Sequence, residues 1–305
     1  MSHPRLHRLL LALYGRCGRA HLPWRKTRDP YRVLVSEFML QQTQVDRALQ
    51  AFEAFVQRFP SLESLATAST ADVVRMWKGL GYNARAVRLK LLARTLMERF
   101  GGAVPSDEAS LRSLPGVGAY TAAAVRAFAF DLDDAAIDTN VRRVVHRWLY
   151  GLEHPPSASA RTLDADARAL VPKGRGHAWN SGLMDLGAAI CTARAPKCSI
   201  CPIRTACAAA PIDAASLDAA RRRHPRRRAP QEIVPFERST RYVRGRIVDR
   251  LRALPPGKRV SLLDLHRELE PQLGERSIGE FGIVVESLVR DGLVAKSGAG
   301  LALRD

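Results

Sequence analysis

The stretch Leu114-Pro115-Gly116-Val117-Gly118 decides the fold, because it joins two helical segments through a glycine-containing turn. Pro115 ends the first segment, while Gly116 and Gly118 let the backbone turn tightly and approach another molecule closely. The apolar helix expected next, over residues 119–130, would direct its N-terminal amide groups at the turn and so favour a phosphate. Such a contact positions DNA without reading its sequence. An ordinary helix–turn–helix corner has the same pattern, so the rest of the chain must distinguish the two.

The composition favours a polyanionic partner. Across 305 residues, 48 Lys and Arg against 30 Asp and Glu give a formal charge of +18, which attracts nucleic acid in a salt-dependent manner. A basic surface alone would give the same charge, but the arginines cluster. The run at residues 221–228, RRRHPRRR, is too charged and too interrupted by proline to fold alone, so we expect a linker there.

The chain shows no membrane signal. No apolar stretch approaches the roughly 20 residues of a membrane span. Residues 9–14 resemble the apolar part of a signal segment, but the stretch is short and Arg16 follows it. We therefore expect a cytoplasmic, nucleoid-associated monomer without a membrane partner.

Hydrophobic periodicity predicts helices through most of the first 190 residues. The segments with helical spacing are 31–40, 45–59, 71–77, 84–100, 119–130, 140–150, 162–170 and 178–190. Near the C-terminus, three apolar helix faces precede residues 293–296 and 301–303, which flank the turn 297–300 as a β-hairpin. The sequence thus predicts an all-α array followed by a small winged helix.

Four cysteines share one short basic segment. Cys191, Cys198, Cys201 and Cys207 have the spacing C-x6-C-x2-C-x5-C, while Cys17 stands alone far upstream. Disulfides are rare in cytosolic proteins, so the quartet indicates a metal centre. A structural zinc site is one possibility. Zinc ribbons usually contain two C-x2-C pairs, whereas the single pair here is compatible with one iron–sulfur cluster.

At this point several ordered motifs resemble one family, the adenine-specific MutY branch of the helix-hairpin-helix, iron–sulfur DNA glycosylases. The stretches that carry the resemblance are LPWR at 22–25, SEFMLQQT at 36–43, GLGY at 79–82, LPGVG at 114–118, IDTNV at 137–141, MDLG at 184–187 and the cysteine quartet.

The resemblance implies a mainly α fold with two helical domains in a glycosylase region at 1–210. A six-helix barrel domain would span about 26–134, and a cluster domain would combine 1–25 with 135–210. The family's one [4Fe-4S] cluster would be held by the four cysteines, and double-stranded DNA containing a mismatch would be the partner. A basic linker would follow at 211–235, and the winged-helix-like α+β domain at 236–305.

Two carboxylates suit the chemistry of such an enzyme. Breaking a glycosidic bond needs a proton for the leaving base and an anion to stabilise the cationic sugar. Glu37 lies in an apolar run, so burial should raise its pKa and make it a general acid, unless it is a surface glutamate. Asp138 should stay ionised at a helix start, where a plain N-cap would look the same. The family's catalytic acid and aspartate match these residues, with Asn140 beside them.

The resemblance assigns further roles. The bifunctional branch has a lysine at the position of Tyr120, and a phenol cannot form a Schiff base, so hydrolysis without strand cleavage is expected. Packing under the hairpin is the alternative role for Tyr120. Gln42 and Tyr82 match the wedge residues that fill the stack when a base is extruded. The residues expected to contact DNA are Gln41, Gln42, Tyr82, Arg85, Gly116 and Gly118, and those expected in the base pocket are Trp24, Arg25 and Ser181.

Two departures accompany the resemblance. Ser181 stands where adenine-specific members usually carry a glutamine or glutamate, and residues 236–305 do not resemble the nudix-like domain of many members. The predicted function is a monofunctional glycosylase that hydrolyses adenine from a mismatch with guanine or 8-oxoguanine. The alternatives are removal of thymine or uracil opposite guanine, and a noncatalytic DNA-binding regulator.

Overall fold

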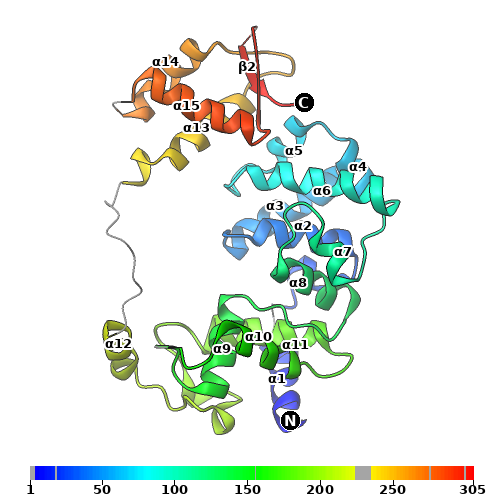
Figure 1. The fold of residues 1–305 in the computed structure, drawn as a ribbon, viewed down its shortest axis with the longest axis vertical. Coiled ribbons are helices and arrows are strands. Elements are labelled where there is room, and N and C mark those ends of the chain that lie inside the picture. The colour runs from blue at the N-terminus through cyan, green and yellow to red at the C-terminus, as the bar shows by residue number, and fades with distance from the viewer. Residues whose placement is uncertain (1–3, 18, 155, 224–234, 275, 299) are drawn as a thin grey trace. The chain divides into compact units, whose positions relative to one another are not determined.

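The computed structural model describes residues 4–305 except positions 18, 155, 224–234, 275 and 299. The chain forms two compact units, and Figure 1 labels their elements in chain order. The first unit comprises residues 1–34, 105–113 and 117–229, and the second comprises 35–104, 114–116 and 230–305. The boundary runs through helix α2 (Pro30–Leu40) and through the glycine-containing turn.

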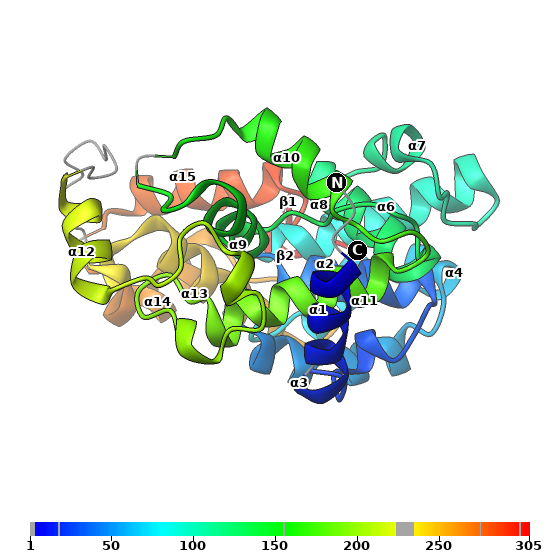
Figure 2. The same ribbon diagram turned by 90° about the horizontal axis from the view of Figure 1, so that it is seen from below.

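The first unit is helical. Its elements are α1 (Pro4–Cys17), α7 (Glu108–Arg112), α8 (Ala119–Phe130), α9 (Thr139–Tyr150), α10 (Ala160–Ala169), α11 (Gly176–Asp185), the π-helical turn η2 (Leu186–Ile190) and α12 (Ala214–Arg223). Helix α1 lies alongside α11 (Figure 2), and α11 also packs on α8 and α9. Apolar side chains such as Leu10, Val141, Trp148, Trp179 and Leu183 form the core between them. This core fixes the start of α9, where Asp138 is placed.

The second unit begins with five helices packed around aromatic side chains. They are the last part of α2, followed by α3 (Val45–Arg58), α4 (Leu62–Thr67), α5 (Thr70–Met76) and α6 (Ala84–Phe100). The ring of Phe55 contacts Phe59 and Trp77 edge to face, with centroids 5.0 and 5.8 Å apart, and all three residues are fully buried. Burial of this size is the main source of stability for such a small core.

Serine and aspartate side chains begin many of the helices. In each case the side-chain oxygen accepts a hydrogen bond from a backbone N–H in the first turn, which satisfies a donor that the helix itself cannot. The capping residues are Ser61, Ser69, Asp107, Asp138, Ser159, Ser239, Ser261 and Ser277. The helix boundaries are therefore encoded locally.

The C-terminal part of the second unit contains three helices and a hairpin. Helices α13 (Thr240–Arg252), α14 (Leu262–Leu273) and α15 (Ile278–Arg290) pack on one another, and strands β1 (Val294–Ser297) and β2 (Gly300–Leu303) follow (Figure 1). The strands are antiparallel, with Val294 opposite Leu303, and Val260 bridges to Leu301 on the other side of β2. This is the element order of a winged helix, so the predicted mainly α fold with a small α+β domain is confirmed.

This C-terminal domain is attached to α5 and α6. Arg252 of α13 donates from Nε to the carbonyl oxygen of Val74, at 3.0 Å, and from Nη2 to Oδ1 of Asn83, at 2.7 Å. The hydroxyl of Thr70 donates to the carbonyl of Asp305 at 3.4 Å. Residues 236–305 thus share a compact unit with residues 35–104, and the predicted domain boundaries stay a prediction.

The predicted basic linker contains a helix. We expected a basic linker over 211–235, and within it residues 214–223 form α12, in which Leu217 and Ala220 are buried. Two apolar side chains three residues apart give this helix a buried side, which outweighs the repulsion among the arginines at its C-terminal end. The rest of the basic run, residues 224–228, lies outside the described residues.

The N-terminal segment that resembles the apolar part of a signal forms the middle of α1, and its Leu10 is buried in the core of the first unit. Among the described helices, none is both long and apolar enough to cross a membrane.

Candidate active site

The glycine-containing turn has the backbone that the sequence predicts. Gly116 has φ of 79°, and a Cβ atom at this position would lie 2.9 Å from the ring of Phe38, so no other residue fits without displacing that ring. Gly118 is the N-cap of α8 and uses no side chain to cap it. Because Gly118 and Ala119 are exposed, the first turn of α8 leaves room for a phosphate. Tyr120 is half-buried in that turn.

Asp138 begins helix α9. Its Oδ1 accepts a hydrogen bond of 2.6 Å from the backbone N–H of Val141, and its Oδ2 accepts one of 2.9 Å from Nδ2 of Asn140. The carboxylate is thus an N-cap and also the acceptor of a side-chain amide, so two donors fix its orientation. It is only partly buried, so the anion can still face another molecule. The interpretation of Asp138 as an N-cap is therefore compatible with its interpretation as a reactive carboxylate.

Asn140 is in turn connected to the cysteine segment. Its Oδ1 accepts a 3.0 Å hydrogen bond from Nη2 of Arg143, and the same nitrogen donates to the carbonyl of Gly187 at 2.7 Å. A Cβ atom on Gly187 would lie 2.8 Å from the Cβ of Asn140, which explains why a glycine stands there. Nε of Arg143 donates to the carbonyl of Cys191 at 2.9 Å. A continuous chain of hydrogen bonds therefore joins Asp138 to the first cysteine.

Glu37 lies in α2 and is only 6% exposed. Its neighbours Phe38 and Met39 are fully buried, so the alternative of a surface glutamate is wrong. The carboxyl group is thus held out of bulk solvent. This is the environment that a proton donor requires.

The two predicted wedge residues share an unusual backbone. Gln42 has φ of 55° and Tyr82 has φ of 44°, values that residues with a side chain rarely adopt. Both side chains are exposed, Tyr82 to 41%. Such conformations persist only where the surrounding structure enforces them, and they concentrate at functional sites. Gln41 precedes Gln42, and together with Gln42 and Tyr82 it lines a groove in the second unit.

Arg85 enforces both conformations. Its Nη1 donates to the carbonyl of Phe38, at 2.8 Å, and its Nη2 donates to Thr43 Oγ1, at 2.9 Å, and to the carbonyl of Leu80, at 2.8 Å. The loop after α2 and the loop before α6 are thereby held to one side chain, which is only 5% exposed. Burial lowers the pKa of Arg85 to about 10. Both terminal nitrogens of Arg85 are directed at the two loops, and its contact with DNA stays a prediction.

The predicted base-pocket residues are largely buried. Arg25 makes two parallel hydrogen bonds with the carboxylate of Asp185, at 2.6 and 3.0 Å, and Nε of Arg19 donates to the same carboxylate at 2.9 Å. Ser181 is completely buried in α11, and Trp24 is 7% exposed. Asp185, one helical turn after Ser181, engages the Arg25 guanidinium, and the roles of Trp24, Arg25 and Ser181 in a base pocket stay predictions.

The four cysteines line one common cavity together with Ile190, Ile203 and Arg147. The backbone N–H of Ile212 donates to Sγ of Cys198 at 3.4 Å, and burial raises the pKa of the Cys201 thiol to about 11. Around a single point, the described residues offer no set of three or more Cys, His, Asp or Glu side chains for a metal ion. The shared cavity and the backbone donors to sulfur nevertheless fit a group held by several thiolates.

Arg147 of α9 is the second arginine that holds this segment. It is fully buried, and its guanidinium donates to both carboxylate oxygens of Glu153 at 2.7 Å and to the carbonyl of Thr192 at 2.8 Å. Its Nη1 also lies 3.6 Å from Sγ of Cys191. Burial would lower the pKa of Arg147, but Glu153 and Cys191 raise it above the ordinary value, so the side chain stays cationic beside the sulfur.

Sequence reasoning did not single out Arg143, Arg147 or Arg241. The first two follow Asp138 at helical spacing, one turn apart, and this placement on one side of α9 was the available signal. Arg241 lies in α13, where nothing in the sequence indicates that it packs against Tyr82.

Comparisons with known proteins agree with this site. Residues 35–167 match the family model described as HhH-GPD superfamily base excision DNA repair protein. The adenine DNA glycosylase of Mycolicibacterium smegmatis is 37% identical over 292 residues, which cover 95% of this chain and 93% of that protein. The adenine DNA glycosylase of Mycobacterium tuberculosis is 45% identical over 196 residues, which cover 64% of each chain.

Among solved structures, a thermostable thymine-DNA glycosylase is 34% identical, with a TM-score of 0.61 over 66% of this chain and 92% of that chain. The long match to the M. smegmatis protein also includes most of the C-terminal domain, since it covers nearly the whole chain. Together with the carboxylates, the turn and the cysteine segment, these matches confirm the predicted family. The chain belongs to the adenine DNA glycosylases of the HhH-GPD superfamily of base excision DNA repair proteins.

Proposed function

We propose that this chain hydrolyses the N-glycosidic bond of an adenine that is mispaired with guanine or 8-oxoguanine in duplex DNA. The observation that carries the proposal is the pair of carboxylates in contrasting environments. Glu37 is buried among apolar side chains, whereas Asp138 is partly exposed and accepts two hydrogen bonds. Such a contrast suits one proton donor and one permanent anion.

Each carboxylate then has one task. The Glu37 carboxyl gives its proton to the leaving adenine as the bond between the base and C1′ of the sugar breaks. The Asp138 carboxylate stabilises the positive charge that develops on the sugar. Water adds to C1′ and loses a proton, so the products are free adenine and an abasic site. The DNA strand itself stays intact, because Tyr120 supplies no amine that could attack the sugar.

The loops around Gln42 and Tyr82 support extrusion of the base. A nucleotide that leaves the stack must be replaced by something of similar shape, and an exposed tyrosine or glutamine can fill that space. The rigid fixation of both loops by Arg85 keeps these side chains outside the protein core. The turn at Gly116 and Gly118 would bind backbone phosphate. Neither contact depends on the base sequence of the DNA.

One [4Fe-4S] cluster is part of this proposal. Cys191, Cys198, Cys201 and Cys207 would hold it, and it would supply a rigid connection across the segment and a redox-active centre. Arg147 lies beside Cys191, where its fixed positive charge offsets the negative charge of the thiolates. The proposal further includes a cytoplasmic location with the nucleoid and action as a monomer.

A panel of base-release assays tests the function. Single-turnover release is measured on duplexes with adenine, thymine or uracil opposite guanine and opposite 8-oxoguanine, with Glu37→Gln as the inactive control. We expect release of adenine in both contexts. The similarity to a thymine-DNA glycosylase and the serine at position 181 favour a second candidate, removal of thymine or uracil opposite guanine, and release of only those bases would replace our proposal with it. Duplex binding with no base released would indicate a noncatalytic regulator.

A further inference from the structure

We infer that the C-terminal domain contributes to the DNA-binding surface. Helix α13 and the two wedge loops form one groove that binds the phosphates of a DNA strand, and Arg241 positions the side chain of the wedge residue Tyr82. The inference rests on the proposed function for the identity of the partner, which is duplex DNA. It assigns a role to residues 236–305 that the glycosylase chemistry does not require.

The groove lies entirely within the second unit and has a volume of about 910 Å³. One wall is formed by residues 41–44 and 79–85, which include both wedge residues, and the other by Phe236 and the first turns of α13. Arg88 of α6 lines the groove, and its Cβ would lie 3.5 Å from a Cβ on Gly116. Gly116 therefore lies close to a residue that lines the groove.

The arginines of this groove fall into two groups. Arg85 is satisfied by loop carbonyls, Arg244 pairs with Asp291, and Arg246 lies 3.7 Å from Asp249. Arg47, Arg88 and Arg241 are exposed and line the same groove, and within the part of the chain that the structure describes they have no carboxylate partner. Unpaired guanidinium groups along one groove are the usual means of binding phosphates.

Arg241 has a second contact that phosphate binding alone does not need. Its guanidinium lies 4.1 Å from the centre of the Tyr82 ring and 5.8 Å from that of Phe236. A guanidinium plane over an aromatic face is attractive, and the contact limits the directions that the ring can take. Tyr82 is exposed and has a left-handed backbone, and of the two guanidinium groups over its ring, Arg241 of α13 at 4.1 Å lies closer than Arg85 at 5.8 Å.

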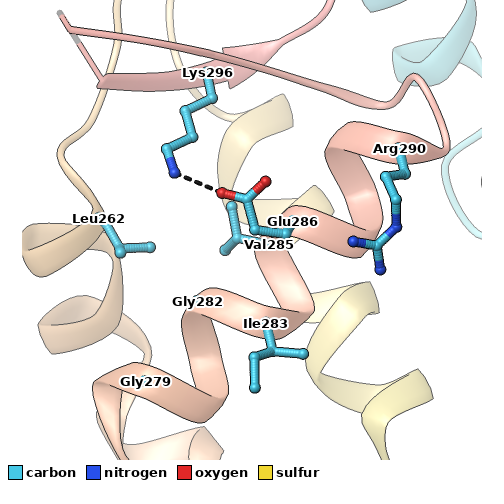
Figure 3. A pocket seen from close by; sticks show the side chains of 8 residues that line it. All are labelled: Leu262, Gly279, Gly282, Ile283, Val285, Glu286, Arg290 and Lys296. Atoms are coloured by element: carbon cyan, nitrogen blue, oxygen red, sulfur yellow. Dashed lines mark hydrogen bonds and ion pairs between the residues drawn. The ribbon is translucent and has the colours of Figure 1, made fainter.

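The helix that reads DNA in most winged helices is α15 in this order of elements, and its outer side is unsuitable for that task. A second hollow of about 410 Å³ lies along it and is lined by Ile283, Glu286, Arg290 and Lys296 (Figure 3). Ile283 is 68% exposed, and Glu286 pairs with Lys296 at 2.5 Å. This surface combines an exposed apolar side chain, an ion pair and one exposed arginine, Arg290. The groove with the wedges is lined mainly by the basic helix α13, and among the described residues α15 contributes only Leu288 to it.

Binding of the full-length protein to fluorescent duplex, matched or with an adenine–guanine mismatch, tests the groove. Titrations at several salt concentrations give the slope of log Kd against log salt. Arg241→Gln should reduce the steepness of this slope by about 0.9 and weaken binding roughly fivefold, because one phosphate contact is lost. Arg47→Gln and Arg88→Gln should each do the same. Arg290→Gln is the matched control, since Arg290 is an exposed arginine of the same domain that lines the other hollow.

The positioning role needs a different readout. Arg241→Lys keeps the charge but lacks the planar guanidinium, so it should retain the salt slope and lose at least half of the fluorescence increase of a 2-aminopurine placed beside the mismatch. Equal slopes for wild type, Arg241→Gln and Arg290→Gln would overturn the groove, and a wild-type fluorescence increase in Arg241→Lys would overturn the positioning role. Because matched duplex is not a substrate, a wild type that binds as expected yet releases no adenine would refute the proposed function and leave the groove intact.

Discussion

Nε of Arg143 donates a hydrogen bond of 2.9 Å to the backbone carbonyl of Cys191, while Nη2 of the same side chain donates to Asn140 at 3.0 Å. Asn140 in turn donates to Asp138. One arginine thus connects the first cysteine of the quartet to the partly exposed carboxylate through three hydrogen bonds in series. The orientation of Asp138 then depends on how the cysteine segment is folded.

Arg143→Gln should slow base release by roughly 10- to 100-fold, because a carboxylate that loses its supporting hydrogen bonds is held less firmly. It should also lower the free energy of unfolding by about 2 kcal/mol, since the carbonyls of Gly187 and Cys191 lose a charged donor. Single-turnover kinetics and urea unfolding measure both effects. The control is Arg142→Gln, whose side chain makes a half-exposed ion pair with Asp164 worth at most about 1 kcal/mol. Identical rates in the two variants would show that the connection is unimportant.

Glu37→Gln should reduce base release by a factor of about 10² to 10⁴, because an amide of the same shape cannot donate the proton that the leaving base needs. Duplex affinity should change little, since binding depends on phosphate contacts elsewhere. Rate constants at saturating protein and anisotropy titrations separate the two. Glu63→Gln, an exposed glutamate in α4, should behave as wild type. Release by Glu37→Gln at the wild-type rate would identify another residue as the acid.

The cysteine quartet predicts a brown protein with iron and sulfide each near about four per chain. Cys198→Ser should lose colour, iron and DNA affinity together, because the segment from 191 to 207 contains only short helical turns and depends on its ligands for its shape. Cys17→Ser, the cysteine outside the quartet, should retain all three. Colourless wild-type protein with one zinc per chain and full activity would contradict the cluster.

Asp185 contributes to stability in a pH-dependent way. Burial alone would raise its pKa, but the hydrogen bonds and charges of Arg25 and Arg19 hold the pKa below its ordinary value. A depressed pKa stabilises the folded state above the unfolded value of about 3.9 and loses that effect as the pH falls below it. Asp185→Asn should cost about 3 kcal/mol at neutral pH, because two arginines lose their shared carboxylate.

The difference between wild type and Asp185→Asn should be constant from about pH 5 to pH 8 and should shrink below about pH 4. Chemical denaturation across this range measures it. Asp72→Asn is the control, since Asp72 pairs with Arg58 and Arg75 on the surface and such pairs contribute at most about 1 kcal/mol. A difference that grows on acidification would refute the assigned sign.

The sequence predicted those features that depend on local chemistry. The predicted first and last residues of helix α6 match the observed ones because its apolar residues recur at regular helical spacing. The role of Asp138 as an N-cap followed from its residue type at the start of a helix. The partners of Arg25 and Arg85 were not predictable, because each guanidinium bonds to atoms far away in sequence, up to 160 residues for Arg25 and Asp185. An arginine in a motif looks the same whether it binds DNA or a loop carbonyl, and only the fold decides.

Helix α12 was missed because its dense charge was taken as evidence against a helix. The dense charge at residues 221–223 suggested irregular chain, yet two buried side chains, Leu217 and Ala220, are enough to hold a helix against the first unit. Charge density alone therefore gives a poor estimate of where a helix ends, since the exposed side of a helix accepts several arginines in its last turn.

Tyr120 lies in the first turn of α8, directly after the turn that contains Gly116 and Gly118. Because a phenol cannot form a Schiff base, wild-type protein should leave an abasic strand that breaks only on later treatment with alkali, and borohydride should trap no covalent complex. Tyr120→Lys should introduce partial nicking, since the new amine would lie at the helix start next to a bound phosphate and near the sugar aldehyde. Gels run with and without alkali compare the wild type with this variant, and Tyr120→Phe is the control that removes only the hydroxyl. Efficient nicking by wild type without alkali would contradict the monofunctional assignment and would direct the search to another nucleophilic amine in the chain.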